Sequence, residues 1–383
     1  MSVTPAPTPA AASVPVPDDA FAAPYVSGDP YADYRHGEFA FARLTDLADR
    51  RLGGAVLAAE DEFFGERENL LSREPAVFDV HAYGHKGKVM DGWETRRRRG
   101  RDARHPFPEA GDHDWALVRL GVPGVIRGIV VDTAHFRGNF PQRVSIRAAE
   151  VEGTPSEAEL ARDSVHWEEI LPETPVRGHA ANGFAIASGR RWTHLRVAQH
   201  PDGGIARLRV HGEVLPDPAW LDLLGTVDVV CVINGGSVED ASDGFYSSPG
   251  NTIMPGISLK QDDGWETRRR RDRGHDWIVY RLAAHSEIRA VEIDTANLKG
   301  NAAGWASLSV KDGPEGPWRE VLPAVPLRPD TLHRLPLPAP ATGTHARLDV
   351  FPDGGLARLR LHGSLTPTGR ADLLARTTAA RTA

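Results

Sequence analysis

The chain has 383 residues and a formal net charge of −7 at pH 7, from 45 Lys and Arg against 52 Asp and Glu. This acidic balance disfavours a general polyanion-binding role, and the single cysteine, Cys231, excludes an intrachain disulfide. The longest apolar run, Val227–Ile233, is too short to cross a bilayer, so we expect a cytoplasmic protein with no membrane partner.

The beginning of the chain predicts a tail. Residues 1–24 are rich in Ala, Pro, Val and Thr, with no Lys or Arg and no continuous apolar block. This composition is typical of a disordered segment and differs from a signal peptide. We therefore assign residues 1–38 to a disordered N-terminal tail, and the next segment, Phe41–Leu52, has the pattern of a helix.

The segment Asp91–Arg99 reads DGWETRRRR. In an extended strand Glu94, Arg96 and Arg98 share one face, because side chains alternate along a strand. Glu beside Arg is typical of a site for an anionic, hydrogen-bonding ligand, since a guanidinium binds a carboxylate bidentately. The alternative is an exposed Glu–Arg pair on a sheet, which is worth under about 1 kcal/mol.

Further along the first half, His113 precedes Asp114 and Trp115. A histidine there suits general acid–base chemistry near pH 7, and the alternative is a loop residue ahead of a buried strand. Short β-branched runs bounded by turn residues predict strands, and two stretches predict helices. The strands are Ala116–Leu120, Gly128–Asp132, Arg143–Arg147 and Ala206–His211, and the helices are Ser156–Asp163 and Trp220–Leu224.

The motifs of the first half recur in the second half in the same order. DGWETRRRR returns unchanged at Asp263–Arg271, and PDGG-x-ARLR-x-HG occurs at Pro201–Gly212 and Pro352–Gly363. The chain is therefore a tandem duplication. We assign repeat 1 to residues 39–215, a connector to 216–226, repeat 2 to 227–365 and a loose C-terminal tail to 366–383.

Many short strands with regular turn signals predict an all-β fold of two tandem β-sandwiches. Compared with repeat 2, repeat 1 carries extra residues on both sides of Asp91–Arg99. Insertions of this kind often mark the binding face of a repeat protein. We therefore expect repeat 1 to be the working copy.

Several other chemistries have little support in the sequence. No histidine or cysteine spacing fixes a zinc geometry, and no Walker A, dinucleotide or G-x-S-x-G motif is present. We predict no metal site and no cofactor, and leave a divalent metal open. The four-arginine run is also compatible with nucleic-acid binding, but the acidic neighbours Asp102 and Asp272 and the net charge argue against it.

Four motifs resemble the allantoicase family, from about residue 40 to 365. They are Glu60–Leu71, Met90–Arg97, Val131–Asn139 and Pro201–Gly212, and a fifth motif, G/D-H-D-W, lies at Asp112–Trp115. The resemblance implies two jelly-roll sandwiches of the galactose-binding type. It also implies hydrolysis of allantoate to (S)-ureidoglycolate and urea in purine degradation, a hydrolase reaction on the C–N bonds of a linear amidine. We expect allantoate as the small-molecule partner, no nucleic-acid partner, and a homo-oligomer. The alternative is a tandem sandwich that binds a small molecule or carbohydrate without catalysis.

Allantoate hydrolysis breaks the bond between the central carbon and a ureido nitrogen, so it needs a general acid, a general base and a clamp for the carboxylate. Our hypothesis assigns these roles to polar residues of the repeated motifs. The predicted catalytic residues are Asp91, Glu94, His113, Asp263, Glu266 and His275. The predicted substrate-binding residues are Trp93, Arg96, Arg97, Arg207, Trp265, Arg268, Arg269 and Arg358.

Overall fold

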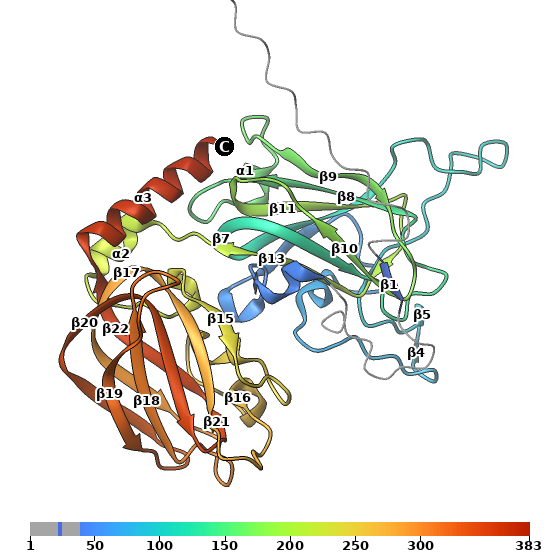
Figure 1. Ribbon diagram of the computed structural model, residues 1–383. Coiled ribbons are helices and arrows are strands. Elements are labelled where there is room, and N and C mark those ends of the chain that lie inside the picture. Colours follow the sequence, from blue (N-terminus) through green and yellow to red (C-terminus); the bar gives the residue numbers. More distant parts are fainter. Residues whose placement is uncertain (1–21, 25–38) are drawn as a thin grey trace, which may run out of the picture.

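The structure is a computed structural model that describes residues 22–24 and 39–383 (Figure 1). The predicted tail lies outside the described residues except at β1 (Ala22–Pro24), which pairs antiparallel with β10 (Ala180–Ala185). Antiparallel strands dominate the rest, arranged as two successive β-sandwiches. The predicted all-β tandem sandwich is confirmed.

In repeat 1 one long strand, β7 (Asp114–Asp132), runs through both layers of the sandwich. Its first half pairs with β3 and β11, and its second half pairs with β13 and β10. The predicted strands Ala116–Leu120 and Gly128–Asp132 are therefore two parts of one bent strand. The other strands are β2 (Thr45–Asp46), β3 (Ala55–Ala59), β8 (Arg143–Ala149), β9 (Glu168–Pro175), β11 (Arg191–His200) and β13 (Arg207–Val214).

Repeat 2 has the same plan around β17 (Asp276–Asp294). A single strand, β20 (Leu332–Phe351), pairs with both halves of β17 and so replaces β10 and β11 of repeat 1. The other strands are β14 (Val227–Asp228), β15 (Ser237–Ala241), β18 (Trp305–Lys311), β19 (Arg319–Pro326) and β22 (Arg358–Leu365).

The repeated nonapeptide forms a two-residue strand in each copy. In repeat 1, β6 (Trp93–Glu94) pairs with β12 (Gly204–Ile205). In repeat 2, β16 (Trp265–Glu266) pairs with β21 (Gly355–Leu356), at the end of the sandwich away from α3 in Figure 1. A hairpin of β4 (Tyr83–Gly84) and β5 (Gly87–Lys88) belongs to the extra residues of repeat 1.

Helical segments are short in both repeats. The predicted helices Ser156–Asp163 and Trp220–Leu224 are confirmed as α1 (Glu157–Leu160) and α2 (Pro218–Leu224). The remaining turns are 3-10 helices: η2 (Ala40–Arg43), η3 (Arg50–Leu52), η4 (Arg67–Leu71), η5 (Val232–Asn234), η6 (Pro249–Ile253) and η7 (Gln261–Asp263).

The predicted helix over Phe41–Leu52 is wrong. Two 3-10 turns flank the short strand β2 there, which pairs with β13. The side chain of Asp46 accepts from the Val210 N–H at 2.9 Å and from the Ala48 N–H at 3.1 Å. These bonds tie the segment to the sheet, and such side-chain bonds to the backbone compete with a helix.

The segment after residue 365 is a helix and not the predicted loose tail. Helix α3 (Pro367–Thr382) buries Gly369, Leu373, Thr377 and Ala380. Figure 1 shows it, in red, extending from repeat 2 towards repeat 1. Its Arg381 donates to Glu150 at 3.1 Å and to Glu152 at 2.7 Å, and both acceptors belong to repeat 1. The helix therefore links the two repeats.

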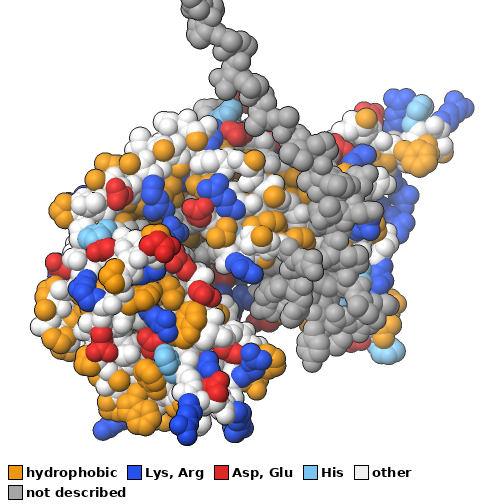
Figure 2. Space-filling view, in the orientation of Figure 1, with side chains coloured by type: hydrophobic (Ala, Val, Ile, Leu, Met, Phe, Trp, Pro, Cys, Tyr) orange, Lys and Arg blue, Asp and Glu red, His pale blue; other side chains and the backbone are white. Residues whose placement is uncertain are grey.

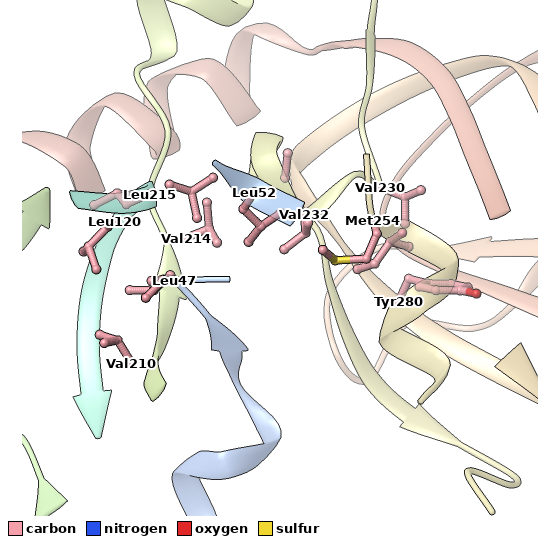
Figure 3. Close-up of a cluster of buried hydrophobic side chains, with 14 of the residues drawn as sticks. Leu47, Leu52, Leu120, Val210, Val214, Leu215, Val230, Val232, Met254 and Tyr280 are labelled. Atoms are coloured by element: carbon pink, nitrogen blue, oxygen red, sulfur yellow. The ribbon is translucent and has the colours of Figure 1, made fainter. Parts of the chain in front are cut away.

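A continuous apolar cluster also joins the repeats. Leu52 and Val214 of repeat 1 lie near Val232 and Met254 of repeat 2 (Figure 3). The outer face of repeat 2 in Figure 2 carries acidic and basic side chains in a mixed distribution. No helix in the described part of the chain is long and apolar enough to span a membrane.

Candidate active site

Glu94 lies at the end of repeat 1, fixed by strand pairing on two sides. Its backbone pairs with Gly204 of β12 and bridges to Gly65. The side chain is half-buried, and the Asn139 Nδ2 donates to its Oε1 at 2.9 Å. Burial raises the pKa of the Glu94 carboxyl above its ordinary value, although the Asn139 hydrogen bond and the charge of Arg97 act in the opposite direction.

The two arginines that follow Glu94 differ in their partners. Arg96 is tied to Asp61, with 3.4 Å between Nη2 and Oδ1, and its guanidinium lies 4.7 Å from the centre of the Phe63 ring. Arg97 is exposed and forms no ion pair with any residue the structure describes, yet its charge acts on Glu94. Unlike Arg96, Arg97 can therefore take a new anionic partner without giving up an ion pair with a described residue.

Asp91 and Arg207 form a pair beneath the site. The Arg207 Nη2 lies 2.8 Å from Asp91 Oδ2, and Arg207 also donates to the Glu74 and Ala206 carbonyls. Arg207 is 2% exposed. In this structure its donors hold the protein chain, and its substrate-binding role stays a prediction. Asp91 also accepts from the Val77 N–H at 2.9 Å, so its carboxylate is occupied as well.

Both tryptophans of the nonapeptide are core residues. Trp93 and Trp265 are 0% exposed, and their indole N–H groups donate to the Asp61 and Asp243 carbonyls. Their rings are buried in this structure, and their place in the binding set stays a prediction. Their buried rings hold the following Glu94 and Glu266 on the outer side of the short strands, because side chains alternate along a strand.

His113 lies in the loop before β7, where its Nδ1 is 2.8 Å from the Gly111 carbonyl oxygen. Its ring centre is 5.1 Å from that of His200. No hydrogen bond joins His113 to Glu94 within the described residues. In repeat 2 the matching His275 is 2.8 Å from Asp349, so the two histidines have different surroundings.

Repeat 2 keeps the backbone of this site and changes its side-chain contacts. Glu266 accepts from the Gln261 Nε2 at 2.6 Å. Arg268 pairs with Asp243 at 2.8 Å, as Arg96 pairs with Asp61 in repeat 1. Arg269, the counterpart of Arg97, is exposed and has no ion-pair partner among the described residues.

Asp263 lies at the junction between the repeats and is 3% exposed. Its carboxylate is 3.2 Å from Arg358 of repeat 2 and 3.7 and 3.4 Å from Arg51 and Arg73 of repeat 1. Burial alone would raise the pKa of this carboxyl. The Leu259 N–H and the arginines Arg358 and Arg73 outweigh burial and hold the pKa below its ordinary value.

Arg358 is buried beside Asp263 and bonds to the protein backbone. It is 3% exposed and donates to the backbone carbonyls of Asp263, Ala357 and Gly256. Like Arg207, it stabilises a loop of its own repeat. The catalytic role of Asp263 and the binding role of Arg358 stay predictions.

Sequence reasoning missed Asn139 as a site residue. Asn139 ends the motif Val131–Asn139, and the recurrence of its Gly-Asn pair at Gly300-Asn301 is the signal that could have identified it. Within the described residues no group of three or more His, Cys, Asp or Glu side chains is placed to hold a metal. A shallow cavity of about 370 Å³ lies elsewhere and contains none of the predicted site residues. Its lining is Val151, Glu152, Thr154, Pro155, Glu159, Arg162, Ser164 and Val165.

Comparison with known proteins matches both sandwiches to one family. The model of the allantoicase repeat matches residues 45–215 and again residues 227–366. The chain belongs to the allantoicase family. A probable allantoicase from Streptomyces coelicolor is 66% identical over 93% of this chain and 94% of its own length. A probable allantoicase from Nocardia farcinica is 52% identical over 85% of this chain and 95% of its own.

A solved allantoicase structure agrees with this assignment. The crystal structure of allantoicase from Saccharomyces cerevisiae superposes with a TM-score of 0.71 at 30% identity, covering 83% of this chain and 92% of that one. The two allantoicase repeats of the present chain share one backbone plan. The carboxylates at Glu94 and Glu266 nevertheless have different hydrogen-bond partners.

Proposed function

We propose that this chain hydrolyses allantoate to (S)-ureidoglycolate and urea, with Glu94 of repeat 1 as the acid–base residue. Membership of the allantoicase family supports the reaction. The observation that carries the site is the surroundings of Glu94, a half-buried carboxyl with a raised pKa next to an exposed arginine that has no ion-pair partner among the described residues. Perturbed carboxyls of this kind are typical of proton-transfer residues.

The reaction requires two proton movements. The bond between the central carbon and one ureido nitrogen breaks, the carbon gains a hydroxyl group from water, and the departing nitrogen gains a proton to give urea. A carboxyl whose pKa is raised stays protonated to a higher pH than an ordinary glutamate, which suits donation to the leaving nitrogen. After donation, the Glu94 carboxylate can accept the proton that water releases.

Arg97 is the proposed clamp for the substrate carboxylate. Its guanidinium has no ion-pair partner among the described residues, so it can bind an anion without first giving up an internal contact. A bidentate arginine–carboxylate pair fixes orientation as well as charge. Holding the carboxylate next to Glu94 places the central carbon, which carries that carboxylate, close to the proton donor.

The test replaces Glu94 and its counterpart separately. We expect Glu94→Gln to lower kcat for urea release from allantoate about 100-fold or more, because positioned acid–base groups contribute about 10²–10⁴ in rate. Glu266→Gln is the matched control. We expect its kcat to stay within about threefold of wild type, which corresponds to a change of less than about 1 kcal/mol in activation free energy.

Two results would contradict the proposal. Near-normal turnover in Glu94→Gln and in the double variant Glu94→Gln/Glu266→Gln would contradict the role of Glu94. If the wild-type protein releases no urea from allantoate, the reaction itself is contradicted. The same assay separates catalysis from the alternative of binding without chemistry, because a binding protein releases no urea. Circular dichroism and thermal melting of each variant verify that the fold is retained.

A further inference from the structure

We infer that Asn139 is a positioning residue that orients the Glu94 carboxyl for proton transfer, an inference that rests on the proposed catalytic role of Glu94. Asn139 lies in the loop between β7 and β8, 45 residues along the chain from Glu94. Asn139 does not itself transfer a proton, and it is not among the site residues predicted from the sequence.

Asn139 and Glu94 are anchored to the same residue. Gly204 pairs with Glu94 in the β6–β12 ladder, and the Gly204 N–H donates to the Asn139 carbonyl at 2.8 Å. The Asn139 Nδ2 then donates to Glu94 Oε1 at 2.9 Å. Three residues from three segments are therefore held together by one strand pairing and two hydrogen bonds.

Gly204 allows this close arrangement because it has no side chain. A Cβ at this position would lie 2.0 Å from an edge carbon of the Phe136 ring, which is 0% exposed. The ring therefore packs directly against the Gly204 backbone. This packing limits the movement of the loop that carries Asn139, so the donor stays at a fixed place relative to Glu94.

The hydrogen bond determines which carboxyl oxygen carries the proton. An amide N–H can only donate, so Oε1 of Glu94 must accept. In the protonated acid Oε1 is then the carbonyl oxygen, and the proton resides on Oε2. Oε2 forms no hydrogen bond with any described residue, which leaves it for the substrate. Asn139 thus directs the acidic proton of Glu94 to the oxygen that has no internal partner.

Repeat 2 lacks this arrangement although it has the same asparagine. The Gly355 N–H still donates to the Asn301 carbonyl at 2.7 Å, but the Glu266 carboxyl bonds to Gln261. The residue of repeat 1 that matches Gln261 is Val89, whose side chain has no donor. Asn301 is therefore a matched control for Asn139, with the same loop and backbone bond and without the bond to the glutamate.

The experiment compares Asn139→Ala with Asn301→Ala in the full chain, measuring kcat and KM for allantoate between pH 4 and 9. We expect Asn139→Ala to lower kcat about 10- to 100-fold, less than the about 10²–10⁴ that a general acid–base group itself contributes. Its pH profile should also shift, because the Asn139 hydrogen bond favours the ionised carboxylate and its loss raises the pKa of Glu94. The limb of the kcat–pH profile that reflects ionisation of Glu94 should move to higher pH, and KM should change less than kcat.

A second variant keeps the inference testable if alanine disturbs the loop. Asn139→Asp has nearly the same shape but replaces the N–H donor by a carboxylate, so it should retain the melting temperature better and move the Glu94 limb further towards high pH. A fall in kcat with an unchanged pH profile in both Asn139 variants would overturn the inference, as would an equal shift in Asn301→Ala. If Glu94→Gln itself does not lower kcat, by contrast, the proposed role of Glu94, on which this inference rests, is overturned.

Discussion

At the scale of single residues, the arginines of the repeated motifs include two contrasting groups. Arg207 and Arg358 are buried and use their donors on backbone carbonyls and on an aspartate of their own repeat. Arg97 and Arg269 are exposed and have no ion-pair partner in the described part of the chain. Repetition alone does not distinguish these groups, since a loop anchor and a substrate clamp both require an arginine.

The two groups predict opposite effects of the same substitution. Arg207→Met should lower the free energy of unfolding by about 3 kcal/mol, because it leaves the Asp91 carboxylate and buried carbonyls without donors. Arg97→Met should leave the free energy of unfolding within about 0.5 kcal/mol of wild type and raise KM for allantoate. Denaturant unfolding and urea-release kinetics on both proteins measure this contrast. A stable Arg207→Met protein would show that the buried pair does not support the loop.

Prediction from sequence was most successful where the evidence is local. Glu94 follows from a repeated strand motif, whereas its contact with Asn139 joins residues 45 positions apart and depends on where the β7–β8 loop lies in space. The burial of Arg207 was missed for a similar reason. Its alternating neighbours indicate a strand correctly, but they do not show that the 73–77 loop covers that face.

At the scale of elements, α3 is a helix that the sequence pattern did not predict. Its buried positions are Gly369, Leu373, Thr377 and Ala380, at helical spacing but mostly small or polar. They form no apolar stripe, so the usual helical periodicity is weak. Conversely, Phe41–Leu52 has such a pattern but contains β2 and two 3-10 turns, because its contacts with β13 override local preference.

The packing of α3 can be tested with two adjacent leucines. Leu373 is 1% exposed and Leu374 is 55% exposed. Leu373→Ala should destabilise the protein by about 2–5 kcal/mol, through lost burial and a cavity, and Leu374→Ala by less than about 0.5 kcal/mol. Thermal and denaturant unfolding provide the comparison. Equal effects of the two substitutions would contradict the docking of α3 on the sandwiches.

At the scale of the whole molecule, the two repeats are joined asymmetrically. Arg51 and Arg73 of repeat 1 both approach Asp263 of repeat 2, and the residues that match these arginines in repeat 2 are Ile233 and Pro255. The reciprocal ion pairs are therefore chemically impossible. The two identical nonapeptides therefore have different surroundings: one contains the proposed proton donor Glu94, and the other contributes Asp263 to the junction.

The junction predicts a specific dependence of stability on pH. The pKa of Asp263 is lowered in the folded state from an ordinary value of 3.8. Its stabilising contribution is therefore complete above the pKa of the unfolded chain and is lost as the pH falls through the lower folded value. Asp263→Asn should melt at a lower temperature than wild type at pH 7, and the difference should shrink towards about pH 2.

Melting curves between pH 2 and 7 measure this difference. Asp262→Asn is the matched control, because it removes the same charge from the neighbouring exposed residue, whose only described ion pair is with Lys260. A difference between wild type and Asp263→Asn that stays constant with pH would show that the carboxylate charge does not hold the junction.

The contact between α3 and repeat 1 has a consequence for synthesis on the ribosome. Arg381 binds Glu150, which precedes it by 231 positions. Arg191 also pairs with Glu150 and Glu152 and is translated before Arg381, so these carboxylates can pair with Arg191 before Arg381 has emerged. Domains commonly fold in the order in which they leave the ribosome. Repeat 1 is translated first, but its contact with α3 can form only after repeat 2 and α3 have been translated.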